Sequence, residues 1–306
     1  MSRSDSTLKT LRDALRQEEL TLSAELSLRP GQSAIEILEQ AKTLSAAADA
    51  IQVPDNRNAL PHMSNIAVAS LLRQEGLDPV VHMNSRDRNR IAFQSDLLGA
   101  QGIGVTNLLL MRGESLAKRN KPRIHGIFDI KAVEMIAKAA SIRDGGTFAG
   151  VEFPGASELF IGSVATVFNP ETNWQPEKLI EKADAGAQFI QLQVCLDMDI
   201  LREYMAALVA AKLMWRFNVL VGLAVLPSAD AARRMRQLQP DSIIPAALMK
   251  RLEHSTDAEA EGVKVCAELL QELSQIPGVA GANIMTPGDP DSIPAAVHAS
   301  GLRASA

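Results

Sequence analysis

Several residue classes are scarce in this sequence of 306 residues, and each shortage excludes a class of protein. The only two cysteines, Cys195 and Cys266, lie in apolar contexts, which excludes a disulfide framework and indicates the reduced thiols of a cytoplasmic protein. Basic residues are in deficit, with a formal net charge of −5, so nucleic acids and anionic membranes are excluded as expected partners. No run approaches the roughly 18 apolar residues of a membrane helix, and residues 1–19 are too polar for a secretory signal.

Familiar catalytic signatures are missing as well. No Gly-rich fingerprint follows the first strand pattern, which weakens a dinucleotide-binding open sheet, and neither a serine elbow nor a Cys–His signature is present. None of the histidines has a partner three or four residues away, so we expect no metal ion. The histidines are His62, His82, His125, His254 and His298.

Short apolar runs alternate with amphipathic segments of about a dozen residues. The expected strands are 20–28, 50–53, 79–84, 107–113, 159–167, 189–196, 218–226 and 281–286. The expected helices are 33–48, 64–76, 89–102, 130–141, 176–186, 198–216, 228–238 and 293–301. Eight such units predict an α/β fold, a closed (β/α)8 TIM barrel in which residues 1–306 form one catalytic domain. An extra helix is expected within 1–19, and an extra helical segment, 246–275, separates units seven and eight.

Polar residues occupy alternate positions on four of these strands, where a barrel interior is usually apolar. The polar sets are Ser23, Glu25 and Ser27; His82, Asn84 and Arg86; Arg112 and Glu114; and Gln191, Gln193 and Cys195. Alternate strand residues share a face, and burying polar groups unpaired costs several kcal/mol each. We therefore expect these side chains to surround a ligand or water at the carboxyl ends of the strands.

Each residue also has a purely structural explanation. Glu25 could pair with a neighbouring strand, His82 could be a satisfied core histidine, and Gln193 could bridge backbone groups. The charges of the segment 86–89 could form a helix-capping turn, with Asp87 at or near the N-cap and the arginines solvated. The coincidence of four polar sets favours a site, and their amides, carboxylates, arginine and histidine suit a heteroaromatic ligand and an organic cofactor.

The stretch HMNSRDRNRIAFQSDLLGAQGIGVTNLLLMRGE, residues 82–114, resembles the methylenetetrahydrofolate reductase family of flavin-dependent barrels. Further similar segments are AELSLRP (24–30), KADAGAQFIQLQVCLD (182–197), LPSADAARRM (226–235), IIPAALMKRL (243–252) and GVAGANIMTPGDPDSIPAAV (278–297). The resemblance implies a cytoplasmic FAD-dependent oxidoreductase on CH–NH donors that interconverts 5,10-methylene- and 5-methyltetrahydrofolate by hydride transfer. It leaves open whether NAD(P)H is the electron donor, and whether the chain forms a homo-oligomer or uses a redox partner protein.

The resemblance also implies residue roles. Glu25 matches the acid that protonates the folate, Glu114 stands where the family usually has aspartate near pterin and flavin, and Gln193 matches the amide that binds the pterin. The positions that match flavin contacts are His82, Arg112, Gly113, Ala165 and Lys182, the last near the phosphates. Residues assigned to the cofactor by neighbourhood alone are Asn84, Arg86 and Asn169.

Two departures from the family pattern concern ligand contacts. Pro54 replaces a hydroxyl residue that contacts the flavin in many relatives. The helix 228–238 lacks the phenylalanine that stacks on nicotinamide and folate, and Arg236, Gln237 or Leu238 stands there. We expect Arg236 to attract folate carboxylates, with poor NADH use or a preference for methyl-folate oxidation.

Two other functions remain open at this stage. The chain could be a barrel oxidoreductase on another one-carbon carrier, or a non-catalytic partner subunit of a one-carbon complex. The presence of Glu25, His82 and Gln193 argues against the non-catalytic subunit.

Overall fold

Eight parallel strands close into a barrel in the computed structural model, which describes residues 10–17, 19–114, 125–148, 151–152, 158–171 and 174–303. Around the barrel the strands are β1 (Thr21–Glu25), β2 (Ala50–Val53), β3 (Pro79–Asn84), β4 (Asn107–Met111), β7 (Phe160–Ala165), β8 (Phe189–Val194), β9 (Asn218–Ala224) and β10 (Val279–Met285). All eight coincide with the expected strand segments. The predicted (β/α)8 barrel is confirmed.

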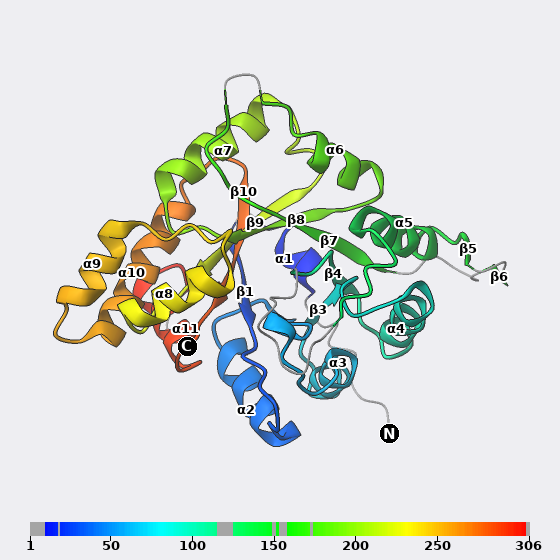
Figure 1. Ribbon diagram of the computed structural model, residues 1–306, viewed down its shortest axis with the longest axis horizontal. Helices are drawn as coiled ribbons and strands as arrows, with labels where there is room; N and C mark the ends of the chain where they lie inside the picture. Colours follow the sequence, from blue (N-terminus) through cyan, green and yellow to red (C-terminus); the bar gives the residue numbers. More distant parts are fainter. Residues whose placement is uncertain are drawn as a thin grey trace.

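One helix follows each barrel strand and packs on the outside (Figure 1). These helices are α2 (Ala34–Ser45), α3 (Asn65–Gln74), α4 (Arg90–Gly102), α5 (Ala132–Arg143), α6 (Glu177–Asp184), α7 (Met198–Ala210), α8 (Ala229–Leu238) and α11 (Ser292–Ser300). The expected extra segment forms α9 (Ala246–His254) and α10 (Ala258–Leu273), and α10 packs beside α11. A two-stranded antiparallel pair, β5 (Thr147–Phe148) and β6 (Val151–Glu152), lies outside the barrel.

Polar side chains cap five of these ten helices, α2, α4, α7, α8 and α10, and satisfy backbone N–H groups that have no partner in the first turn. Ser33 accepts from the N–H of Glu36, whose carboxylate returns to the N–H of Ser33, a complete capping box before α2. Ser228 accepts from the N–H of Ala231 and so sets the start of α8. The segment at the end of α8 lies at the mouth of the barrel.

The amino-terminal end of the barrel interior is apolar and closed by a helix. Part of the expected N-terminal helix is present as α1 (Leu11–Ala14), and residues 1–9 of that expected helix lie outside the described residues. Leu11 is fully buried against inward-facing side chains of the strands, which are Ala50, Val80, Leu109, Phe160, Phe189 and Leu220. Phe160 stacks on Phe189 with ring centroids 5.0 Å apart. The Phe189 ring fits here because residue 162 is glycine: a Cβ at Gly162 would lie 2.1 Å from that ring.

The outward faces of the strands and the helices form a second, larger apolar cluster. Cys195 belongs to it, so its expected place in one set with Gln191 and Gln193 is wrong. The pairing of β8 with β9 shifts between Leu192 and Val194, and this irregularity breaks the strict alternation of faces. Cys195 then bridges to Ile243 instead of facing the interior set.

A buried carboxyl group couples α1 to the barrel. One oxygen of Asp78, Oδ2, accepts from the backbone N–H of Leu11 at 2.8 Å and from Nδ2 of Asn107 at 2.7 Å. Burial raises the pKa of Asp78 to about 6, although both hydrogen bonds lower it.

This raised pKa predicts a pH-dependent stability. The folded chain holds the Asp78 proton more tightly than the unfolded chain, so the Asp78 contribution to the free energy of unfolding falls as pH rises from about 4 to about 6. Asp78→Asn cannot titrate. In urea unfolding at several pH values we expect the stability of the wild type relative to this variant to fall by up to about 3 kcal/mol over that interval. Asp199→Asn, at an exposed carboxylate, is the control. If the difference in stability between wild type and Asp78→Asn is as independent of pH as that between wild type and Asp199→Asn, Asp78 does not have a raised pKa.

Candidate active site

The carboxyl-terminal half of the barrel interior is polar. Its buried side chains come from five strands and are Ser23, Glu25, Gln52, His82, Gln191 and Asn283. Ser23, Gln52 and Asn283 are fully buried, and hydrogen bonds join all six side chains into one network. The predicted polar interior is therefore present, and its groups satisfy one another beneath the mouth of the barrel.

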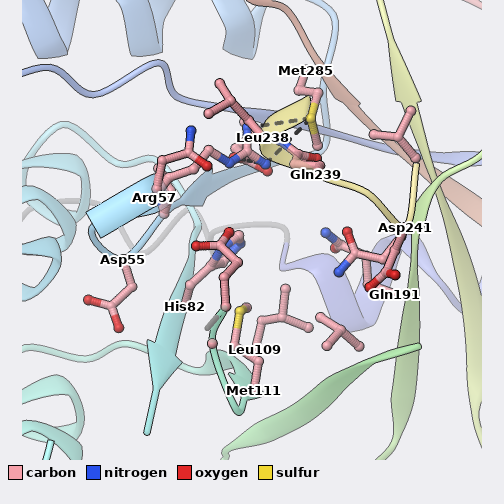
Figure 2. A pocket seen from close by; sticks show the side chains of 18 of the residues that line it. Asp55, Arg57, His82, Leu109, Met111, Gln191, Leu238, Gln239, Asp241 and Met285 are labelled. Carbon is pink, nitrogen blue, oxygen red and sulfur yellow. Dashed lines mark hydrogen bonds and ion pairs between the residues drawn. The ribbon is translucent and has the colours of Figure 1, made fainter. Parts of the chain in front are cut away.

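Glu25 lies at the floor of the site with its side chain 2% exposed. Nδ2 of Asn283 donates to its Oε2 at 3.2 Å, and Arg57 forms an ion pair with its Oε1 at 2.9 Å. Arg57 belongs to a short 3-10 turn after β2, and its guanidinium also lies 3.4 Å from the sulfur of Met285 (Figure 2). The purely structural pairing considered for Glu25 is thus present, but the pair faces a cavity.

The turn that carries Arg57 has an unusual backbone. Asn56, Asn58 and Ala59 all have positive φ, at 46°, 56° and 57°. Non-glycine residues in this region are strained, and such strain gathers at ligand-binding segments. The Arg57 side chain is 35% exposed, so this partner of the buried Glu25 carboxylate reaches solvent.

His82 combines the two explanations considered for it. Its Nε2 lies 2.7 Å from Oε1 of Gln52, so the ring is satisfied in the core, and it also lines the cavity. Burial lowers the pKa of His82 to about 4, with Glu25 acting in the opposite direction and Arg57 in the same one. The imidazole is therefore neutral at physiological pH.

Two contiguous cavities open above this layer. The central cavity, of about 600 Å³, lies over Glu25, His82 and Gln191 (Figure 2). The side cavity, of about 610 Å³, extends toward α6. The wall common to both is formed by Met111, Arg112, Gly113, Glu114, Val164, Gln193 and Asp241. Each volume lies in the range of about 300–1,000 Å³ that is typical of ligand pockets.

The side cavity gathers aromatic rings in a chain that has few. Trp174 and Tyr204 lie with ring centroids 5.4 Å apart, and Phe168 meets both edge-on. Lys182 lines the same cavity, and Nζ donates to the carbonyl of Val164. Burial lowers the pKa of Lys182, which an anionic ligand would counteract. The aromatic cluster was not expected, because its members are separated by up to 36 positions in the sequence.

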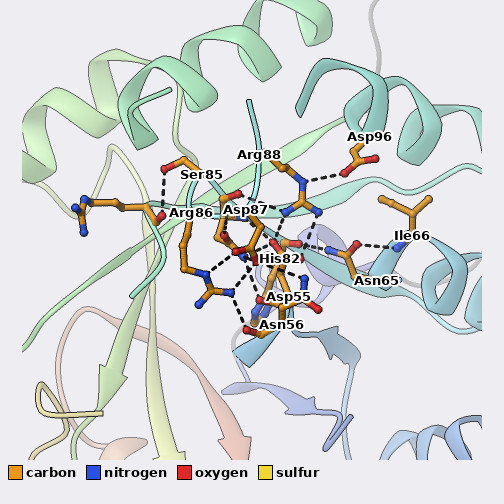
Figure 3. A network of polar contacts seen from close by, with 12 residues as sticks. Asp55, Asn56, Asn65, Ile66, His82, Ser85, Arg86, Asp87, Arg88 and Asp96 are labelled. Atoms are coloured by element: carbon orange, nitrogen blue, oxygen red, sulfur yellow. Dashed lines mark hydrogen bonds and ion pairs between the residues drawn. The ribbon is translucent and has the colours of Figure 1, made fainter. Parts of the chain in front are cut away.

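Two arginines of the charged segment after β3, Arg86 and Arg88, are buried rather than solvated (Figure 3). Arg86 is 1% exposed and binds both carboxylate oxygens of Asp87, the carboxylate of Glu114 at 3.1 Å and the carbonyl of Asn56. Arg88, 7% exposed, binds Asp55 and Asp96. The capping explanation holds in part: Asn89, two residues after Asp87, is the N-cap of α4 and its side chain accepts from the N–H of Ala92. The expectation that Arg86 and Arg88 are solvated is wrong.

Gly113 follows β4 at the shared wall with φ +83°. A Cβ there would lie 3.0 Å from Cβ of Arg86 and 3.1 Å from that of Asn84. The position therefore requires glycine, and its backbone can approach a ligand in either cavity.

The structure brings together most of the residues selected from the sequence. Those lining one or both cavities are Glu25, His82, Arg86, Arg112, Gly113, Glu114, Ala165, Lys182 and Gln193. Asn84 lies behind the wall, where its amide binds Asp55. Asn169 and Arg236 are exposed and line neither cavity. Gln237 and Leu238 line the central cavity where Arg236 was expected.

Three residues that contact one another or Glu25 beneath the central cavity were also missed in the sequence. Gln52 is the single polar residue of β2, and Asn283 is the single amide of β10. The alternation argument used for the other strands would have selected both. Arg57 had no such signal, because it lies on an irregular turn rather than on a strand.

Among the described residues, no group of three or more histidine, cysteine, aspartate or glutamate side chains could hold a metal ion. No helix in that part of the chain has both the length and the apolar character needed to cross a membrane.

Similarity to solved structures is broad and distant. A 2,3-dimethylmalate lyase of the PEP mutase/isocitrate lyase superfamily is 17% identical, with 79% of this chain and 83% of that chain covered and a TM-score of 0.46. A 4-hydroxy-2-oxoglutarate/2-dehydro-3-deoxyphosphogluconate aldolase is 12% identical, with 95% and 98% covered and a TM-score of 0.46. No curated protein matches the chain.

The family model decides the relationship. The model for methylenetetrahydrofolate reductase matches residues 10–301. This range includes every strand of the barrel and every residue that lines the two cavities. The chain therefore belongs to the methylenetetrahydrofolate reductase family.

Proposed function

We propose that the protein is a cytoplasmic FAD-dependent oxidoreductase on CH–NH donors that interconverts 5,10-methylene- and 5-methyltetrahydrofolate. Family membership supports methylenetetrahydrofolate reductase activity in general. The observation that carries the finer proposal is Glu25, a buried carboxyl group at the floor of a cavity whose wall holds Gln193 and Glu114. A carboxyl group in that position can hold the proton that folate ring opening consumes.

The cavities fit a flavin dinucleotide. Arg112 and Gly113 line both cavities, so one extended ligand can contact them along its length. Phe128 holds the Arg112 guanidinium, which lies 4.3 Å from the ring centroid. Lys178 and Lys182 line the side cavity and can balance phosphate charge. When bound, FAD would supply the hydride carrier that the side chains lack.

Both carboxylate oxygens of Glu25 are engaged. Arg57 forms an ion pair with one, and Asn283 donates a hydrogen bond to the other. Arg57 lies on the strained turn and is partly exposed, so folate entering the cavity can displace the guanidinium. Loss of that contact would free an oxygen of Glu25 to meet the substrate.

Leu238 supports the proposal of weak NADH use. It projects over the central cavity, 54% exposed, in the region where the family resemblance places a stacking phenylalanine (Figure 2). A leucine offers no aromatic face to the nicotinamide, and stacking contributes about 0.5–1.5 kcal/mol beyond burial. We therefore propose that methyltetrahydrofolate reduces the flavin faster than NADH does, with another redox partner or the oxidative direction in use.

Leu238→Phe tests this role. In stopped-flow measurements we expect flavin reduction by NADH to become up to about tenfold faster, or NADH binding up to about tenfold tighter, because a stacking face is restored. Leu60→Phe, at another exposed leucine, is the matched control and should leave both half-reactions unchanged. Wild-type reduction by NADH as fast as by methyltetrahydrofolate would contradict the proposal.

The function itself is tested by reconstitution with FAD. The loaded protein is expected to be yellow and to bleach when methyltetrahydrofolate is added without oxygen. Bleaching by a different one-carbon carrier alone would identify another barrel oxidoreductase. A protein that takes up no flavin would match the non-catalytic subunit and refute the proposed activity.

A further inference from the structure

A continuous row of hydrogen bonds crosses the barrel interior from His82 to Glu25. Nε2 of His82 lies 2.7 Å from Oε1 of Gln52, and Nε2 of Gln52 donates to Oγ of Ser23 at 2.9 Å. Oγ of Ser23 donates to Oδ1 of Asn283 at 3.2 Å, and Nδ2 of Asn283 donates to Oε2 of Glu25. Every donor in the row points toward the carboxylate.

Gln52 is the branch point of this row. Its Nε2 also donates to Oε1 of Gln191 at 2.6 Å, so both amide protons are used and only Oε1 remains for His82. That oxygen is an acceptor, and Nε2 of His82 must therefore carry a proton. A neutral imidazole has one N–H, so Nδ1 bears a lone pair. Among the described residues, the ring of His82 makes its hydrogen bond through Nε2 alone.

The same branch orients Gln191. Its Oε1 is occupied by Gln52, so its own amide protons are left for other partners, and Gln191 lines the central cavity beside His82. Neither residue can reverse its hydrogen-bonding role without breaking a bond to a fully buried amide, which costs about 1–3 kcal/mol.

We propose that Gln52 is a positioning residue that fixes His82 as the Nε2–H tautomer and turns the amide of Gln191, so that a ligand in the central cavity meets an acceptor at His82 and a donor at Gln191. The matching ligand edge offers an N–H or O–H group to His82 and an oxygen or unprotonated nitrogen to Gln191. That the ligand is a flavin or folate rests on the proposed function, whereas the tautomer does not.

The row orients groups and does not carry protons. Carboxamide groups such as those of Gln52 and Asn283 keep their protons at ordinary pH, so a proton cannot pass from His82 to Glu25. Polarised rows of hydrogen bonds strengthen one another. The placement of Glu25 is therefore coupled to Gln52 through Ser23 and Asn283, although Gln52 does not touch the carboxylate.

Nitrogen-15 NMR of the histidine-labelled protein without cofactor tests the tautomer, with His82→Gln identifying the signals. The expected result is an imidazole with protonated Nε2 and bare Nδ1 that stays neutral between about pH 5 and pH 8. In Gln52→Glu a carboxylate replaces the amide oxygen near the ring, so we expect His82 to titrate at a clearly higher pH. The other charges that act on His82, Glu25 on β1 and Arg57 after β2, are unchanged in this variant.

Gln52→Leu removes both the oxygen that accepts from His82 and the N–H group that donates to Gln191. We expect mixed His82 tautomers and about tenfold weaker FAD binding in a fluorescence titration. Gln188→Leu is the matched control. It lies before β8 at the opposite end of the barrel, where its Oε1 accepts from Ile161 and Arg143, and it should change FAD binding less than twofold.

Protonated Nδ1 in the wild type would overturn the proposal, as would a His82 signal that Gln52→Glu leaves unchanged. If Gln52→Leu fails to fold, the wild-type tautomer and the Gln52→Glu titration still decide. A correct tautomer in a protein that binds no flavin would refute the proposed function and leave the assignment to Gln52 intact.

Discussion

Glu25→Gln is expected to lower the rate of methylenetetrahydrofolate reduction by about 10²- to 10⁴-fold, the usual contribution of a general acid. Glutamine keeps the size of the side chain and can still accept from Nδ2 of Asn283, so the site should keep its shape. It cannot supply the proton. FAD binding and flavin reduction by the pyridine nucleotide should be close to wild type, which separates a missing proton from a damaged site.

A matched variant gives this experiment its reference. Glu39→Gln makes the same chemical change on the exposed face of α2 and should leave turnover unchanged. A loss of less than about threefold in Glu25→Gln would remove Glu25 from the mechanism. Equal losses of turnover and FAD affinity would mean that the carboxylate is structural.

Asp55→Asn is expected to lower the free energy of unfolding by about 3–5 kcal/mol, the typical result of breaking a buried ion pair. The Asp55 carboxylate lies 2.5 Å from Arg88 and also accepts from the backbone N–H of Asn84. Burial lowers the pKa of Arg88, but Asp55 and Asp96 more than offset this and raise it. Without Asp55, the partly exposed Asp96 is the one charged partner that the buried guanidinium keeps among the residues the structure describes.

Urea unfolding followed by tryptophan fluorescence measures this loss, and Asp129→Asn is the control. Asp129 pairs with Arg90 at the surface, where both side chains are nearly half exposed, and such pairs contribute about 0–1 kcal/mol. Similar small losses in the two variants would show that the segment after β3 is not held by its buried charges.

Local patterns in the sequence were sufficient for the fold. Short apolar runs between amphipathic segments marked all eight barrel strands. On four of them an alternation of period two also marked a polar face, since each strand has one face toward the barrel and one toward helices. Strand and helix periodicities act within a few residues of one another, so they can be recognised without a partner. The same alternation placed Glu25, His82 and Gln191 on interior faces.

The burial of charge could not be recognised in this way. Arg86 and Arg88 resemble solvated residues in the sequence, and several of their partners lie far along the chain. Arg86 binds the carbonyl of Asn56 and the carboxylate of Glu114, and Arg88 binds Asp55. The N–H of Ile127 covers the same segment by donating to the carbonyl of Arg86. Whether a guanidinium is solvated or buried depends on those distant segments, and a sequence window does not contain them.

The sequence also did not determine which residue at the end of α8 lies over the central cavity. Helical residues turn by about 100° each, so neighbouring positions near the end of α8 face different directions. The start of α8 at its Ser228 cap and its end at Leu238 direct Arg236 to solvent and place Leu238 over the cavity. Local periodicity therefore determined the barrel and its polar faces. Closure of the barrel decided which polar groups meet, because hydrogen bonds and ion pairs require contact between strands that are up to 260 residues apart.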